Sequence, residues 1–486
     1  MMRWAAIAGI LAVLTSCSSP EPTSGPSGDV ATELAGKVSV DGMYTHLRKF
    51  QEIADANNGS RAKGTPGYDD TVDYVVQFLR DKGFDVQTPE FELLGRTQGG
   101  RPTLTAAGRD YHVDQASLLI TTPPGGLRAV TRRPQKVAGC SSADYGTVSV
   151  KGAIAVVNDT GCSIVDKQNV AVDRGAVGLL VVSAPGTSGS PAGLFPADYY
   201  QQLTVPVGVI DNDADAALRR TNAPVRLVLD SKPVMTKSRN VVAQTKTGDT
   251  NNVVVVGAHL DSAPGSPGIN NNGTGVAAVL ETAAALGSQP QLDNAVRFAF
   301  WGSEENALQG STKYVRGLDR DQLDDIALYL DFDMLGSPNA GYFTYDGDQS
   351  GQANPDIPLR AVPAGSAGIE RTLAGHLNLT GVRPADMPLT TNADYYAFLA
   401  AGVPIGGLTT GSSQRKTEVQ ARLWGGRAGV AFDPNDRLPR DTIDNVDREA
   451  LSAMGSAVAF AVATYAQSVE GVNGVPARDQ RNRNAP

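Results

Sequence analysis

The chain has 486 residues, which corresponds to two or three folded domains of ordinary size. Charged residues make up 19% and hydrophobic residues 41%, a composition that is too apolar for a disordered protein. The 42 basic and 51 acidic residues give a net charge of −9, and this diffuse acidic balance argues against nucleic acid as a partner.

The N-terminus has the pattern of an export signal. A positive charge at Arg3 precedes the apolar run Trp4–Leu14, which is too short to span a bilayer. The run leads into Leu14-Thr15-Ser16-Cys17, which resembles a bacterial lipobox; the alternative is an ordinary signal peptide with a coincidental cysteine. We therefore expect a signal peptide over 1–16, lipidation of Cys17, and a protein exported and lipid-anchored to the outer face of the cell membrane.

A flexible tether is expected over 17–40, because this segment is rich in Ser, Pro, Gly and Thr. Apolar residues at helical spacing then predict helices over Met43–Asn57 and Tyr68–Lys82. A strand is expected at Phe84–Thr88. These elements form the first part of a domain that resumes after an insertion.

The inserted segment, over residues 118–232, has a different pattern. We expect strands at Gly152–Val157, Gly178–Ser183 and Val205–Ile210, and a helix at Asn169–Arg174. The stretch VKGAIAVVNDTGCSIVDKQNVAVDRGAVGLLVVSAP resembles the protease-associated (PA) domain, a β-rich insert of secreted peptidases that usually carries no catalytic residues. Its Gly-Cys pair after the first strand matches Cys162.

Two cysteines lie in this segment. In an exported protein, an isolated pair such as Cys140 and Cys162 is expected to form a disulfide. A loop of about twenty residues closed in this way stabilises the fold by roughly 3 kcal/mol in the chain-entropy description. Zinc binding is the less favoured alternative, because two lone cysteines lack the other ligands.

Strand and helix patterns alternate after Asn240. Strands are expected at Val253–Ala258, Ala295–Trp301, Ile326–Phe332 and Pro404–Thr409, and helices at Gly275–Leu286, Gly310–Arg316, Ser366–Leu377 and Val446–Gln467. Helices between buried strands imply an α/β fold whose central sheet is covered on both faces. Ligands of such sheets lie outside the carboxyl ends of the strands.

Three loops at these strand ends carry polar residues that packing does not explain. His259 and Asp261 follow the first strand, Glu304 and Glu305 the second, and Asp333 the third. One histidine with several carboxylates at a single sheet edge is the chemistry of a hydrolytic metal site. Taken singly, each loop has a simpler interpretation; His259, for example, could be a buried histidine with satisfied hydrogen bonds. The occurrence of all three loops at successive strand ends favours the metal site.

The motifs GAHLDS, GINNNGTGVAAVLETA, RFAFWGSEENALQGSTKYV, LDFDMLGSPN, GVPIGGLTTGSS and FDPNDRLPRDTIDN resemble, in this order, the secreted bacterial two-zinc aminopeptidases. The resemblance covers 41–117 and 233–468 and implies a mixed central sheet, with 469–486 expected to be a disordered tail. It also implies zinc as the cofactor and peptides or protein N-termini as partners. A monomer is expected.

The resemblance implies a role for each matching residue. His259, Glu305 and Asp333 match metal ligands, Glu304 matches the general base, and Asp261 matches the residue that orients the imidazole.

Three family positions are substituted. Asn271 replaces the aspartate that bridges the two metals, Arg437 replaces the late histidine ligand, and Asn392 replaces an arginine that contacts substrate. An amide oxygen supplies no negative charge between two dications, and arginine offers no lone pair to a metal. The expectation is therefore one zinc ion or none, with the guanidinium of Arg437 on Glu305 or Glu304.

Two functions remain open. The cleft is either a peptide- or partner-binding module that has lost hydrolysis, which the combined substitutions favour, or an active aminopeptidase. The second would use one zinc or a replacement ligand such as Asp436, since one zinc is enough to lower the pKa of water.

Overall fold

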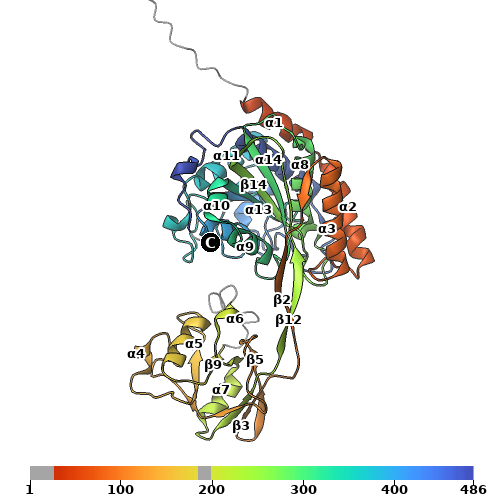
Figure 1. Cartoon of the computed structure of the whole chain (residues 1–486). Coiled ribbons are helices and arrows are strands. Elements are labelled where there is room, and N and C mark those ends of the chain that lie inside the picture. The colour runs from red at the N-terminus through yellow and green to blue at the C-terminus, as the bar shows by residue number, and fades with distance from the viewer. Residues whose placement is uncertain (1–26, 184–198, 485–486) are drawn as a thin grey trace, which may run out of the picture.

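The computed structural model describes residues 27–183 and 199–484, so Cys17 and the expected signal peptide lie outside the described residues. Two bodies are joined by a long two-stranded ribbon (Figure 1). The ribbon pairs β2 (Glu90–Gln98) antiparallel with β12 (Lys232–Arg239). The smaller body is thus inserted into the larger one through two neighbouring strands.

The larger body is built on an eight-stranded sheet in the order β1-β13-β15-β14-β16-β19-β17-β18. The central strands β15, β14, β16 and β19 are parallel; β13 runs antiparallel to both of its neighbours, and β17 runs antiparallel to β19 but parallel to β18. The strand bounds are β1 (Asp85–Gln87), β13 (Val241–Gln244), β14 (Asp249–His259), β15 (Asn294–Trp301), β16 (Ile326–Phe332), β17 (Phe343–Tyr345), β18 (Ala385–Met387) and β19 (Ile405–Thr409). The predicted α/β fold with a mixed sheet is confirmed.

Helices cover both faces of this sheet. In β14, Val254 and Val256 belong to one core while Val253 and Val255 belong to the other, as the two-residue alternation of a strand requires. The first core holds α2 (Val40–Ala56), α3 (Pro66–Asp81), α8 (Thr274–Leu286), α11 (Ser366–Leu379) and α14 (Arg448–Gln467). The second holds α9 (Gln309–Arg316), α10 (Arg320–Asp325) and α12 (Tyr395–Ala400).

Local sequence sets the helix starts. Ser39 caps α2 by accepting from the backbone N–H of Gly42, and Thr65 caps α3 ahead of Pro66 at the first helical position. α14 is long and apolar enough to cross a membrane by composition, but 67% of its apolar window is buried inside the fold. It is therefore the central core helix of the larger body.

Both ends of the described chain are more ordered than expected. The tether prediction is wrong from residue 27 onward, where α1 (Ser27–Lys37) buries Ala31 and Leu34 against Ala459 and Ala463 of α14.

The predicted disordered tail over 469–486 is also wrong for the residues described, up to 484. Arg481 donates to the backbone oxygens of Asn251 and Asp324, and Arg483 donates to those of Leu323 and Ile326. The composition of this segment does not encode contacts between its arginines and distant backbone oxygens.

The insert contains a five-stranded sheet, β5-β10-β9-β8-β7, and a four-stranded antiparallel sheet, β4-β3-β11-β6. Its elements are β3 (Thr103–Ala106), β4 (Arg109–His112), β5 (Asp114–Gln115), β6 (Leu127–Ala129), β7 (Thr131–Arg132), α4 (Ser142–Tyr145), β8 (Ile154–Asn158), α5 (Ile164–Asp173), β9 (Gly178–Val182), α6 (Tyr199–Gln202), β10 (Val207–Ile210), α7 (Asn212–Arg219) and β11 (Val225–Val228). Strands β3 and β5 precede residue 118 yet pair with β11 and β10, and β4 pairs with β3, so the insert begins earlier than expected.

Candidate metal centre

The predicted site residues lie at the carboxyl ends of the parallel strands. His259 is the last residue of β14 and is the register partner of Trp301, the last residue of β15. Glu304 and Glu305 follow β15, and Asp333 follows β16 directly. Parallel strands bring these three loops to one edge of the sheet.

His259, Asp333 and Glu304 form a cluster whose histidine and glutamate are buried. The Nε2 atom of His259 lies 3.4 Å from Asp333 Oδ1 and 3.9 Å from Glu304 Oε2. Two ligands of a tetrahedral zinc ion stand about 3.3 Å apart when each bond is about 2.0 Å. The spacing of His259 and Asp333 therefore suits one shared zinc ion.

Three buried oxygen atoms in this region have no hydrogen-bond partner: Asn271 Oδ1, Glu304 Oε2 and Asp333 Oδ1. An unsatisfied buried acceptor costs about 1–3 kcal/mol, so several in one region need an explanation. A cation satisfies such oxygens. The donor set of His259 and Asp333 is consequently one that fits a metal ion.

The electrostatics of the cluster also favour positive charge. Burial lowers the pKa of His259, but the carboxylates of Glu304 and Asp333 outweigh it and raise that pKa well above its usual value. Burial, together with Asp394 and Asp333, raises the pKa of Glu304 well above its usual range, against the opposing effect of His259. The cluster therefore attracts either protons or a metal ion.

Asp261 contacts the imidazole through its main chain rather than through its carboxylate. The Nδ1 atom of His259 contacts the backbone oxygen of Asp261 at 3.0 Å, whereas the Asp261 carboxylate lies 4.0 Å away. This carboxylate instead accepts the backbone N–H groups of Glu304 at 2.9 Å and Glu305 at 3.3 Å. Asp261 orients the imidazole through its main chain and fixes the two glutamates through its side chain.

The other half of the centre is filled by hydrogen bonds between side chains. Arg437 Nε donates to Glu305 Oε2 at 2.7 Å, the contact that the sequence led us to expect. Asn271 Nδ2 donates to Glu305 Oε1 at 3.2 Å and to Asp436 Oδ1 at 2.7 Å, and the Ser412 hydroxyl donates to Asp436 Oδ2. Every carboxylate oxygen of Glu305 and Asp436 thus has a partner.

Asn392 is exposed, and it is the neighbouring Asp394 that is buried near the cluster. Ser311 donates its hydroxyl to Asp394, and burial raises the pKa of Asp394 to about 7. Asn392, the substituted family position, is therefore not one of the buried charged or polar groups of the candidate centre.

Two residues that organise the site were missed in the sequence. Arg61 is fully buried and donates to the backbone oxygens of Leu260, Pro267 and Gly268, 199 to 207 residues later in the chain. Asp441 accepts the backbone N–H groups of Asn270 at 2.7 Å and Asn271 at 3.0 Å. No local pattern marks Arg61, because all three of these partners are backbone carbonyls.

A second acidic group, Asp346, Glu370 and Asp386, brings three carboxylates within 4.8 Å of one another in the described part of the chain. Asp346 accepts backbone N–H groups from Ser350 and Gly351, and Glu370 accepts them from Gly347 and Asp348. This group therefore stabilises the loop that follows β17.

Sequence comparison places both parts of the chain among known families. Residues 240–462 match the profile of peptidase family M28, and residues 128–218 match that of the PA domain. The probable lipoprotein aminopeptidase LpqL of Mycobacterium tuberculosis is 44% identical, over 98% of this chain and 96% of its own length. An aminopeptidase of Pseudomonas aeruginosa is 34% identical, over 94% and 85%.

Solved structures support the same fold. The aminopeptidase from Aneurinibacillus sp. strain AM-1 superposes with a TM-score of 0.64 at 24% identity, covering 91% of this chain and 98% of that one. The zinc aminopeptidase BSAP from Bacillus subtilis gives 0.57 at 22% identity, covering 90% and 98%. At these identities the likeness concerns the fold.

Proposed function

The chain belongs to the M28 aminopeptidases with an inserted PA domain, and from this premise we propose an exported lipoprotein that binds peptide N-termini but holds at most one zinc ion. Hydrolysis is weakened or lost. The lipid would be attached at Cys17 and would hold the protein at the outer face of the cell membrane.

The observation that carries this proposal is the ion pair between Arg437 and Glu305. Glu305 is the carboxylate that the family resemblance assigns to the second metal, and its two oxygens are taken by Arg437 and Asn271. Burial opposes the charge of the guanidinium, but Glu305 and Asp436 raise the pKa of Arg437 above its usual value. A fixed positive charge at this place repels a dication. The guanidinium also balances the negative charge of the carboxylates, as the second metal ion would otherwise do.

The first metal position keeps usable ligands. His259 and Asp333 would hold zinc, with Asn271 as a neutral third donor. Zinc, when bound, supplies Lewis-acid activation of water and of a peptide carbonyl. Glu304, whose Oε2 lies 3.9 Å from His259 Nε2, would exchange a proton with a water molecule bound there.

An active one-zinc aminopeptidase is the second candidate, favoured by these same ligands. Asp436 contributes little to it, because both of its carboxylate oxygens are engaged by Asn271 and Ser412. The two candidates predict the same first metal position and differ in catalytic rate.

We test the proposal with the double substitution Asn271→Asp and Arg437→His. Zinc per chain is measured after dialysis against buffered zinc, and hydrolysis is followed with an aminoacyl p-nitroanilide. The unmodified protein is expected to hold at most one zinc. The double variant is expected to hold two and to hydrolyse at least about 100-fold faster, since it regains a bridging charge and a neutral ligand.

A matched control makes the same two chemical changes at exposed positions, Asn378→Asp and Arg440→His, and should change neither quantity. Two tight zinc ions in the unmodified protein would refute the proposed stoichiometry. Equal hydrolysis by the unmodified protein and the double variant would establish the active one-zinc enzyme instead.

A further inference from the structure

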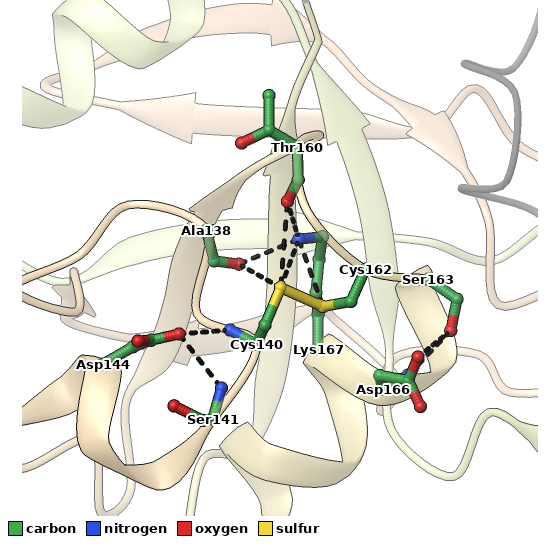
Figure 2. The surroundings of a disulfide bond; sticks show 9 residues. All are labelled: Ala138, Cys140, Ser141, Asp144, Thr160, Cys162, Ser163, Asp166 and Lys167. Carbon is green, nitrogen blue, oxygen red and sulfur yellow. Dashed lines mark hydrogen bonds between the residues drawn. A yellow bond between two sulfur atoms is a disulfide. The ribbon is translucent and has the colours of Figure 1, made fainter. Parts of the chain in front are cut away.

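A buried lysine stands against the disulfide of the inserted domain (Figure 2). Cys140 and Cys162 are bonded, and the Nζ atom of Lys167 lies 3.5 Å from the Cys140 sulfur and 3.6 Å from the Cys162 sulfur. The amine also donates to the backbone oxygens of Ala138 at 2.9 Å and Thr160 at 2.5 Å. The nitrogen is thus held nearly equidistant from the two sulfurs.

The position of this lysine is unusual for a charged residue. Lys167 has no exposed surface, and in the described part of the chain its hydrogen bonds go to carbonyl and sulfur atoms rather than to a carboxylate. A buried ammonium is costly unless nearby groups stabilise its charge. A sulfur that becomes negatively charged would be such a group.

We propose that the Cys140–Cys162 pair is a site of thiol–disulfide exchange, at which Lys167 stabilises the sulfur that leaves as a thiolate. The co-substrate is a thiol. This inference is independent of the metal centre and of whether the protein hydrolyses peptides.

The exchange runs in two balanced steps. An external thiolate attacks the sulfur of one cysteine, a mixed disulfide forms, the Cys140–Cys162 bond breaks, and the other cysteine leaves as a thiolate. A second external thiolate then attacks the sulfur of the external group, releasing the first cysteine as a thiolate and forming the oxidised external disulfide. Exchange is faster when the leaving thiol has a low pKa, and an adjacent ammonium lowers it.

Access and charge around the pair are compatible with this role. Both cysteine residues are only partly buried, which is compatible with attack by a small thiol. Burial lowers the pKa of Lys167, while Asp159, Asp144 and Asp166 oppose this and favour the charged amine. Asp144 faces Cys140 through the Cys140 backbone N–H at 2.8 Å, and Lys136 lies 4.0 Å from Asp144.

The test compares the full-length protein with Lys167→Met, Lys167→Arg and the matched control Lys151→Met, an exposed lysine of the same domain. Reduction by dithiothreitol at pH 7 is quenched with iodoacetamide, and Cys140 and Cys162 are quantified by peptide mapping, which separates them from Cys17. Lys167→Met is expected to be reduced about three- to tenfold more slowly than the unmodified protein. Lys167→Arg and Lys151→Met should stay within twofold of it.

A second measurement does not depend on the folding of the methionine variant. In the reduced unmodified protein, alkylation rates of Cys140 and Cys162 are measured against pH, and at least one is expected to titrate clearly below the usual value of about 8.5. Equal reduction rates for the unmodified protein and a folded Lys167→Met variant overturn the proposal. The proposal is also overturned if both thiols titrate at the usual pKa of about 8.5.

Discussion

Single side chains set the charge balance of both acidic regions of the larger body. At the candidate metal centre, Arg437 and Asn271 share the oxygens of Glu305, so a change at either position alters the partners of the same carboxylate. For this reason the two substitutions belong together. At the loop after β17, burial and neighbouring carboxylates raise the pKa of both Asp346 and Glu370, so protonation of this group is favoured.

The proton at that loop gives a prediction for Glu370. Burial and the charge of Asp348 raise the pKa of Glu370 to about 7 from an ordinary value near 4.5. Between these two values the folded state binds more protons than the unfolded state, so stability falls as the pH rises through the window. Glu370→Gln keeps the acceptor for the N–H groups of Gly347 and Asp348 but removes this ionisation.

Thermal unfolding from pH 5 to pH 8 checks this. The unmodified protein should lose on the order of 2 kcal/mol more stability across that range than Glu370→Gln. Parallel pH profiles for the two proteins would contradict the assignment. Glu418→Gln, on an exposed helix, serves as the control and should leave the profile unchanged.

The sequence predicted the candidate site residues at or just after the ends of buried strands, namely His259, Glu304, Glu305 and Asp333. It did not predict the support around them. For Asp261, it is the backbone oxygen and not the carboxylate that contacts the imidazole of His259. Arg61 donates to backbone carbonyls of a loop that is distant in the sequence. Such contacts are set by backbone geometry, which residue types alone do not encode.

At the scale of elements, the buried strands and long amphipathic helices were predictable because their apolar residues follow the period of the element. The ribbon strands β2 and β12 and the helix α1 were not predicted, since each owes its structure to its partner. Among the described residues β2 pairs with β12 alone, and α1 buries Ala31 and Leu34 on α14.

Packing within the sheet gives a prediction for Gly257 of β14. A Cβ atom there would lie 2.4 Å from the Tyr329 hydroxyl and 2.7 Å from Trp301 Nε1. Trp301 donates to Tyr329, Tyr329 donates to Asp331, and the Tyr329 ring stacks on Phe398. Movement of Tyr329 or Trp301 away from the new Cβ atom would therefore break these interactions. Gly257→Ala is expected to destabilise the larger body by about 2 kcal/mol.

The matched control is Gly375→Ala in α11, where a Cβ atom would meet nothing within 4 Å. There alanine should be neutral or stabilising by up to about 1 kcal/mol, because glycine is the weaker helix former. Chemical denaturation of the two variants checks the contrast. Equal stability of the two variants would contradict the prediction, because it would show that the sheet accommodates a Cβ atom at position 257.

At the scale of the whole molecule, the proposed lipid anchor precedes a fold that begins at α1, at the end of the larger body away from the insert (Figure 1). Cys17→Ser is expected to move the protein from the membrane fraction to the soluble fraction, because the lipid would be its means of attachment. Detergent phase partition of expressed protein measures this. Ser19→Ala, which keeps the cysteine, should stay with the membrane; an unchanged distribution for Cys17→Ser would remove the anchor from the proposal.

The ribbon also dictates an order of events during synthesis. β1 completes its sheet only by pairing with β13, where Asp85 faces Gln244, and the whole insert is translated between them. At roughly 5–20 residues per second the intervening stretch takes about 8–30 s. By the end of that interval the insert has all the strands of its own sheets, whereas α2 and α3 still lack the central strands that cover their apolar faces. The inserted domain is therefore able to fold before the larger body that surrounds it in the sequence.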